Sequence, residues 1–125
     1  KKISGRVVYT DRLAPLSEEF GNNILELLKK NSDLDGIFAT SDVMAANIIR
    51  ACKKMGKRVP EDISIVGFDD TWISTLTYPS ITTIHQPVRE MCEYAIEAIV
   101  KKVKSEKVPS QVVFPVELID RESTK

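Results

Sequence analysis

Three short apolar runs, separated by two segments with helical periodicity, constrain the fold of this chain more than any other feature. The runs cover residues 6–10, 36–40 and 63–68, and connectors of a few residues join them to the segments between. Within those segments apolar residues recur three or four positions apart, as they do on one face of a helix. Successive parallel strands need a crossover connection, which is usually a helix. The alternation therefore predicts an α/β fold, with a parallel sheet flanked by helices.

Both helical segments begin at residues that favour a helix N-terminus. Ser17 precedes the first segment, and Ser41 and Asp42 open the second, where a side-chain oxygen can accept a hydrogen bond from a free backbone N–H. The second helix is predicted to end at Gly56, since glycine adopts the left-handed conformation that closes many helices. The run that follows each helix is too apolar for a half-exposed strand, so we expect both runs to be buried strands.

The last third of the chain departs from this alternation. Pro87 stands where proline is favoured, at the first turn of a helix predicted to reach about Lys104. Residues 111–119 are predicted to be extended, and Pro115 within them favours an edge strand or a bend. The predicted helix has an apolar face made of Met91, Ala95, Ile96, Ile99 and Val103.

Charge and cysteine content limit the function. Eighteen basic residues balance eighteen acidic ones, whereas a surface that grips DNA needs a basic excess. No apolar run is long enough to span a bilayer. Cys52 and Cys92 have no second Cys or His at metal-ligand spacing, and we expect both to be small buried side chains in a cytoplasmic protein. The sequence thus predicts no metal ion and no cofactor.

Polar residues follow the predicted strands at the edge where parallel sheets bind ligands, beyond the carboxyl ends of the strands. Ser41 and Asp42 follow the second apolar run, and Asp69 and Asp70 follow the third. Carboxyl groups at this edge accept hydrogen bonds from hydroxyl or amine donors, which suits a polyol. For Asp42 and Asp70, capping of a helix is the alternative. Gly67, just before the edge, would let neighbouring backbone and side chains approach closely.

Other functions for these residues stay open at this point. Trp72 could stack on a sugar face or pack at an interface, and the lone His85 is more often a hydrogen-bonded structural residue than a base. Asp42, Asp69 and Asp70 together could hold magnesium in a phosphoacceptor or phosphatase domain. The chain has no glycine-rich phosphate loop and no nucleophile elbow. We therefore expect a binding domain and not an enzyme.

Four motifs occur in a fixed order and cover most of the chain. They are IFATSDVMA at residues 37–45, GKRVPEDISIVGFDD at 56–70, PSITTIHQP at 79–87 and LIDREST at 118–124. In order and spacing they resemble the lactose/galactose repressor family. The resemblance implies a bacterial transcriptional regulator, in which a helix-turn-helix headpiece precedes a two-lobed effector domain of the periplasmic-binding-protein type I fold. A small molecule, usually a sugar, binds between the lobes and changes the affinity for operator DNA.

The resemblance also implies that this chain is an incomplete part of such a domain. Residues 1–86 would form the C-terminal lobe, truncated at its start, and residues 87–110 a crossover helix that belongs to the N-terminal lobe. Residues 111–125 would return to the C-terminal lobe, and the DNA-binding headpiece would be absent. The implied partners are a small-molecule effector, operator DNA only through the missing headpiece, and a second copy in a homodimer.

Particular residues take roles from the same match. Asp69 would be the main hydrogen-bonding acid for the effector, Ser41 a polar contact, and Gln86 a residue at the hinge near the cleft. Leu16 falls where many relatives carry an aromatic that stacks on the sugar, so Trp72 or a residue outside the chain would have to supply that platform. Family dimers pack the helix after Ser41 against its twin, and the corresponding surface would use Ala45, Ala46, Ile49 and Tyr78.

A periplasmic sugar-binding protein of a transporter shares this fold and cleft, and is the alternative reading of the resemblance. The coding sequence upstream of Lys1 distinguishes the two, by a helix-turn-helix or a signal peptide. In either case the apolar face of the predicted crossover helix would lack its usual cover, which favours association or a domain-swapped arrangement.

Overall fold

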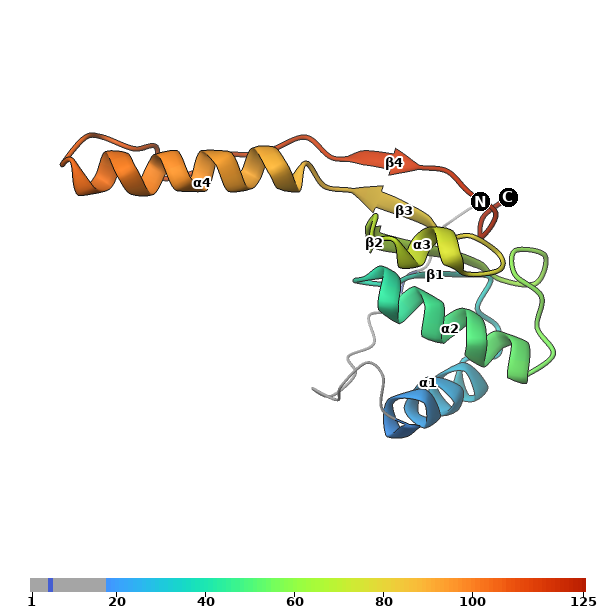
Figure 1. The fold of residues 1–125 in the computed structure, drawn as a ribbon. Helices are drawn as coiled ribbons and strands as arrows, with labels where there is room; N and C mark the ends of the chain where they lie inside the picture. Colours follow the sequence, from blue (N-terminus) through green and yellow to red (C-terminus); the bar gives the residue numbers. More distant parts are fainter. Residues whose placement is uncertain (1–4, 6–17) are drawn as a thin grey trace.

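A computed structural model describes residue 5 and residues 18–125 of the chain. The strand predicted at residues 6–10, the predicted cap Ser17 and the candidate ligand residue Leu16 lie outside the described residues. Figure 1 shows the described elements, which in chain order are α1 (Glu18–Lys30), β1 (Gly36–Phe38), α2 (Asp42–Lys54), β2 (Ser64–Asp69), α3 (Ile73–Leu76), β3 (Thr82–His85), α4 (Val88–Val103) and β4 (Glu117–Ile119).

The described strands form one sheet in the order β1-β2-β3-β4. The first three are parallel, which confirms the predicted α/β architecture. Strand β4, in the last third of the chain where the predicted alternation ends, pairs antiparallel with β3. The chain leaves β3 into α4 and comes back along the length of that helix, and this return reverses its direction. Pro115 precedes β4, in agreement with the predicted edge strand or bend.

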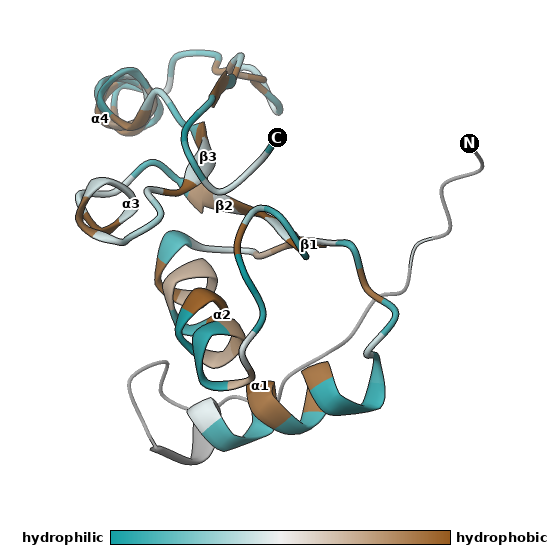
Figure 2. Cartoon of the chain, turned by 90° about the vertical axis from the view of Figure 1, so that its right-hand side faces the viewer, coloured by the Kyte–Doolittle hydropathy of each residue, from teal (hydrophilic) through white to brown (hydrophobic). Residues whose placement is uncertain are grey.

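The core lies between the sheet and two helices on one side of it. Helix α2 packs against β2, and α1 packs against α2; Figure 2 shows hydrophobic stretches, in brown, along both helices and in the strands beside them. Cys52 is fully buried, and burial raises the pKa of its thiol. Cys92 is exposed, so the expectation of a buried side chain was wrong there. The core residues are Ile24, Leu28, Ala39, Ala45, Ile48, Ile49, Ala51, Cys52, Ile63, Ile65 and Ile81.

Strands β1 and β2 are less buried than predicted. Phe38 of β1 is 60% exposed, and its ring meets that of Phe68 edge to face at 6.2 Å between centroids. In β2, Ile65 and Gly67 are buried while Val66 and Phe68 are only partly so. The reason is that α1 and α2 cover one face of the sheet, so side chains that alternate along a strand alternate between core and surface.

The ends of α2 form as its sequence predicts. Ser41 is the N-cap, and its Oγ accepts a hydrogen bond from the Met44 N–H at 3.2 Å. Past the other end, Gly56 has φ of 71°, in the left-handed region that glycine occupies without strain. These caps place Asp42 in the first turn of the helix, directed at the loop after β2.

The C-terminal segment fastens β2 and β3 together after β4. Ser123 is fully buried, and its Oγ donates to the Ile65 carbonyl and accepts from the Thr82 N–H. The Arg121 N–H donates to Thr82 Oγ1 at 2.9 Å. The residues after β4 therefore supply hydrogen-bond partners for backbone and side-chain groups of β2 and β3 that do not pair with another strand.

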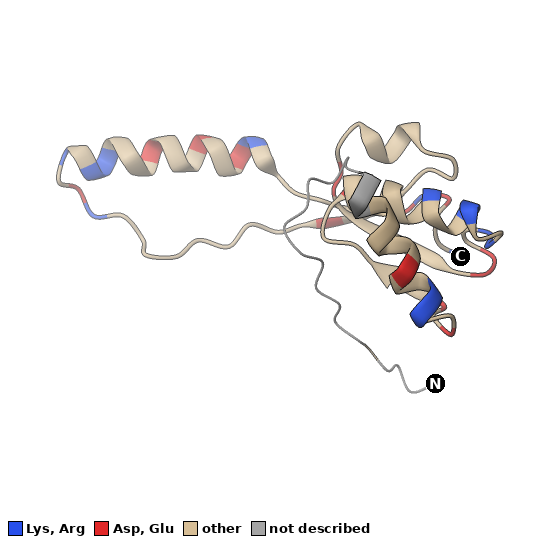
Figure 3. Ribbon diagram, turned by 90° about the horizontal axis from the view of Figure 1, so that it is seen from below, with Lys and Arg blue, Asp and Glu red and all other residues tan. Residues whose placement is uncertain are grey.

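Helix α4 extends away from the sheet as an arm, and the chain returns beside it (Figure 1). Tyr94 and Phe114 join the two limbs edge to face, with ring centroids 5.9 Å apart. No residue of α4 is buried in the described part of the chain. Glu90 lies in the first turn of α4 and Lys101 and Lys102 in the last (Figure 3), and charges so placed complement the helix dipole. Among the described residues, no helix has the length and apolar character to cross a membrane.

Candidate ligand-binding site

The predicted ligand residues follow three neighbouring strands at one edge of the sheet. Ser41 comes after β1, Asp69 ends β2, and Gln86 comes directly after β3. Because these strands are parallel and adjacent, their carboxyl ends lie along the same edge. Asp69 Oδ1 accepts a hydrogen bond from Gln86 Nε2 at 2.7 Å, and both side chains are partly buried. The structure thus brings Asp69 and Gln86 together, while the Ser41 hydroxyl already caps α2 and retains its own proton to donate.

Asp42 lies behind this edge, and the structure corrects its predicted role as a ligand contact. The residue is fully buried. Its Oδ2 accepts from the N–H and the hydroxyl of Thr71, at 2.6 and 3.0 Å, and its Oδ1 accepts from the Thr83 hydroxyl at 2.5 Å. Capping its own helix is not its role either, since Ser41 does that. Asp42 connects the start of α2 to the loop after β2 and to β3.

Gly67 makes room for that connection, as the sequence predicts. A Cβ at this position would lie 2.5 Å from Asp42 Oδ1 and 3.1 Å from Ile81 Cγ2. A side chain on β2 at this point would therefore displace the Asp42 carboxyl from its partners.

Asp69 and Asp70 form a turn that L-amino acids rarely adopt. Their φ angles are 102° and 52°, both in the region where a Cβ meets the backbone. Backbone conformations of this kind cost free energy and persist when surrounding contacts hold them. They also occur often at ligand-binding sites, and here the turn carries the predicted main acid of the site.

Asp70 is held on both carboxyl oxygens. Its Oδ1 accepts from Arg121 Nη2 at 2.7 Å and its Oδ2 is 3.0 Å from His85 Nδ1. Burial works to raise the pKa of Asp70, but the hydrogen bonds and charges of Arg121 and His85 outweigh it, so this pKa lies below its ordinary value. The sequence predicted that Asp70 caps a helix or contacts a ligand, and neither hypothesis included its ion pair with Arg121. His85 is hydrogen-bonded, in agreement with its predicted structural role.

The depressed pKa gives Asp70 a defined contribution to stability. A carboxyl whose pKa is lower in the folded state stabilises the fold above its unfolded pKa, and this contribution disappears as pH falls through the folded value. We expect Asp70→Asn to lower the free energy of unfolding at pH 7 by about 2 kcal/mol. The loss of stability between pH 5 and pH 3 should then be shallower in the variant, as measured by urea unfolding across that interval.

Glu26→Gln is the matched control for Asp70→Asn. Glu26 pairs with Lys30 one helical turn away, at 3.8 Å, and both side chains are exposed. Exposed pairs of this kind contribute little. Equal acid sensitivity of Asp70→Asn and the unsubstituted protein would contradict the assigned role of the Arg121 ion pair.

The roles of the residues that hold the turn were not predicted from the sequence. Arg121, Thr71 and Thr83 are its principal partners. Arg121 lies in the LIDREST motif, which served only to identify the family. A possible signal was present in β3, where two adjacent threonines occupy a strand and, being buried, need hydrogen-bond partners. Trp72 is 72% exposed at the start of α3, and its role in stacking on a sugar stays a prediction.

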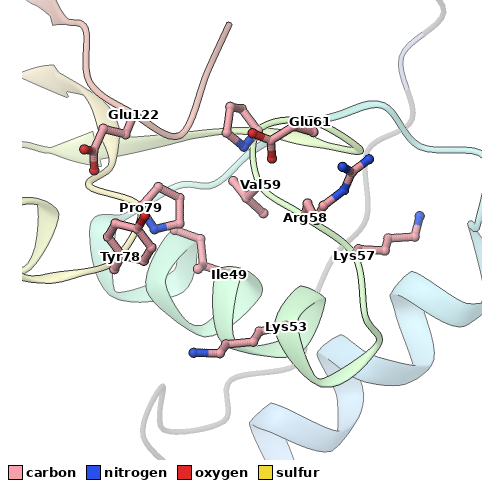
Figure 4. A pocket seen from close by; sticks show the side chains of 10 residues that line it. Ile49, Lys53, Lys57, Arg58, Val59, Glu61, Tyr78, Pro79 and Glu122 are labelled. Atoms are coloured by element: carbon pink, nitrogen blue, oxygen red, sulfur yellow. The ribbon is translucent and has the colours of Figure 1, made fainter.

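The predicted dimer surface divides into buried and exposed residues. Ala45 has no exposed surface and Ile49 has 6%, because both face the core, so the assignment of Ala45 to an interface was wrong. Ala46 is partly buried, whereas Tyr78 is 88% exposed. Figure 4 shows Ile49 and Tyr78 on the wall of an open pocket of about 470 Å³. Its other lining residues are Lys53, Lys57, Arg58, Val59, Pro60, Glu61, Pro79 and Glu122.

The three aspartates that suggested a magnesium site do not gather around one point. Asp42 and Asp70 are each bonded to protein donors on both oxygens. Within residues 18–125, no three His, Cys, Asp or Glu side chains form a group that could hold a metal ion.

The fold is an α/β domain whose sheet edge carries the candidate ligand residues, and comparison with known proteins gives its family. The model of the periplasmic binding protein-like domain matches residues 7–124, and the chain belongs to this family. It is 37% identical over 100 residues to the ribose operon repressor of Halalkalibacterium halodurans, covering 79% of this chain and 30% of that protein.

Two solved structures are similar at the level of fold and sequence. The complex of the transcriptional regulator CelR with cellobiose has a TM-score of 0.78 and 33% identity, over 82% of this chain and 32% of that one. The lac repressor dimer bound to operator and the anti-inducer ONPF has a TM-score of 0.76 and 29% identity, over 82% and 36%. These relatives are regulators and not enzymes, and they confirm the resemblance to the lactose/galactose repressor family. The chain spans about a third of their length.

Proposed function

We propose that this chain is the effector-sensing part of a cytoplasmic transcriptional regulator of the lactose/galactose repressor type. The observation that carries the proposal is the position of Asp69. Its carboxyl group ends β2 in a strained turn, beside Gln86 and on the same edge as Ser41. A carboxyl group fixed at a cleft edge accepts hydrogen bonds from hydroxyl groups, so the ligand is a sugar or a related polyol. The CelR–cellobiose complex supports this ligand class.

We propose that helix α4 and the segment that returns beside it couple ligand binding to DNA binding. In the proposed arrangement, residues 1–86 and 111–125 are assigned to one lobe, and residues 87–110 cross to a second lobe. In support, α4 leaves the sheet directly after Gln86 with its apolar side chains exposed: Ile96 is 63% and Ile99 64% accessible. A ligand that binds one arrangement of the two lobes more tightly shifts the population toward it, and operator affinity changes accordingly.

The test of this proposal is Asp69→Ala in the complete regulator. We expect the effector response to disappear while operator binding is retained, because Asp69 lies on the ligand edge and would not contact DNA. Loss of one charge-assisted hydrogen bond weakens effector binding by about 10- to 100-fold. Operator release by cellobiose and by D-ribose, followed by fluorescence anisotropy, measures the effect. An unchanged titration would remove the main support for the site.

A second copy of the protein is the remaining partner we propose. The exposed Tyr78 beside the pocket of Figure 4 supports a homodimer contact there, as does the similarity to the lac repressor dimer. Aromatic residues at the centre of an interface contribute most to its affinity. We expect Tyr78→Asp to raise the dimer dissociation constant by at least about tenfold, measured by sedimentation velocity of the complete regulator. A dimer of unchanged affinity would place the contact elsewhere.

A further inference from the structure

The segment that returns from the arm ends at the turn that carries Asp69. Arg121 follows β4, and its guanidinium donates to three acceptors. Nη2 donates to Asp70 Oδ1 at 2.7 Å, and Nη1 donates to Ser74 Oγ at 3.0 Å and to the Ile81 carbonyl at 2.9 Å. The side chain is 18% exposed. These contacts fix the guanidinium against α3 and the residue before β3, so it is a rigid anchor for Asp70.

The turn needs such an anchor because its backbone is unfavourable. Asp69 and Asp70 both have positive φ, and a free chain would relax toward negative values. Asp70 is the member of the pair whose side chain is held on both oxygens, whereas Asp69 faces the ligand edge and bonds Gln86. The orientation of the Asp69 carboxyl therefore depends on Asp70 keeping its place. Binding groups must be held to within about 0.5 Å of the productive position to retain their affinity.

We propose that Arg121 is a positioning residue, which acts through Asp70 to fix the Asp69 carboxyl in the orientation that binds a sugar hydroxyl. This inference rests on the proposed function, since Asp69 is the ligand contact proposed there. The segment that leaves the sheet for α4 and the segment that returns from it then both contact the pair Asp69 and Asp70. On the way out of the sheet, Gln86, directly after β3, donates to Asp69, and on the way back Arg121, after β4, donates to Asp70.

The first measurement needs no ligand. Amide hydrogen exchange in the complete regulator reports the Asp70 N–H, which donates to Thr83, and the Thr71 N–H, which donates to Asp42. Relative to amides of α2, we expect Arg121→Gln to accelerate exchange at these two positions by about tenfold. Ser123→Ala is the matched control, since Ser123 is buried in the same segment but bonds Ile65 and Thr82. It should lower global stability and leave that ratio unchanged.

The second measurement separates positioning from general destabilisation. We expect Arg121→Gln to weaken binding of cellobiose or D-ribose by about tenfold in calorimetry of folded protein, and Arg121→Lys to restore part of the loss. In an Asp69→Ala background the same substitution should have no further effect on affinity, because the residue through which Arg121 acts is gone. Ser123→Ala should bind as the unsubstituted protein does.

The outcomes distinguish the two proposals. Unchanged exchange at Asp70 and Thr71 in Arg121→Gln overturns the positioning role, and so does a further loss of affinity in the Asp69→Ala background. If neither sugar binds the unsubstituted protein, the proposed ligand class fails and the exchange ratio alone decides the role of Arg121.

Discussion

Gly67→Ala is expected to destabilise the protein by about 3 kcal/mol, at the upper end of what overpacking of a core costs. The new methyl group would lie 2.5 Å from Asp42 Oδ1, 3.1 Å from Ile81 Cγ2 and 3.3 Å from Thr83 Oγ1. None of the three can move freely, because Asp42, Ile81 and Thr83 are each fully or almost fully buried and Asp42 is bonded to Thr71 and Thr83. Either β2 shifts away from α2, or the Asp42 carboxyl loses its partners.

Urea unfolding measures this effect as a lower midpoint with an unchanged slope. Gly21→Ala is the matched control: Gly21 lies within α1, and a Cβ there would meet nothing within 4 Å. Replacing glycine by alanine inside a helix stabilises it by about 0.5–1 kcal/mol. The same substitution is thus expected to have opposite signs at the two positions. A midpoint for Gly67→Ala equal to that of the unsubstituted protein would show that the contact with Asp42 can relax.

The elements of the fold could be predicted because local signals define them. The cap at Ser41, the closing Gly56 and the periodicity between them give the bounds of α2 to within a residue or two. The proline before β4 predicted an edge strand or a bend, and β4 is an edge strand. Burial was harder to predict, since an apolar run such as that around Phe38 does not reveal whether one face of its strand or both are covered.

The position of the candidate site could be predicted from the sequence, but the contacts that hold its residues in place could not. The edge with Ser41, Asp69 and Gln86 follows from where polar residues succeed strands, together with the family resemblance. The contacts that hold the turn at Asp69 join residues 13 to 51 positions apart. No local pattern links Asp42 to Thr71, or Asp70 to Arg121, so periodicity and spacing carry no information about these pairs. The sequence consequently favoured Asp42 as a cap or a ligand contact, when it is a buried connection between elements.

Because Asp42 connects these elements, Asp42→Ala is the second substitution for which we expect a large loss of stability. The substitution removes the acceptor for the Thr71 N–H, the Thr71 hydroxyl and the Thr83 hydroxyl. Thr83 is fully buried, so water cannot replace the lost partner without opening the core. Buried donors left without partners cost about 1–3 kcal/mol each, and we expect a total loss of about 4 kcal/mol. The melting temperature and the urea midpoint should both fall.

Glu90→Ala separates this effect from a helix-dipole effect. Glu90 is the acidic residue in the first turn of α4, as Asp42 is in α2, but it is exposed. An exposed acid at that place contributes about 0.3–1 kcal/mol through the dipole alone. If Asp42→Ala costs no more than Glu90→Ala, the hydrogen bonds to Thr71 and Thr83 contribute nothing net. A cost for Asp42→Ala several times that for Glu90→Ala would show that the ligand edge depends on a buried carboxyl that the ligand does not contact. In that case Asp42→Ala should also disturb the turn at Asp69.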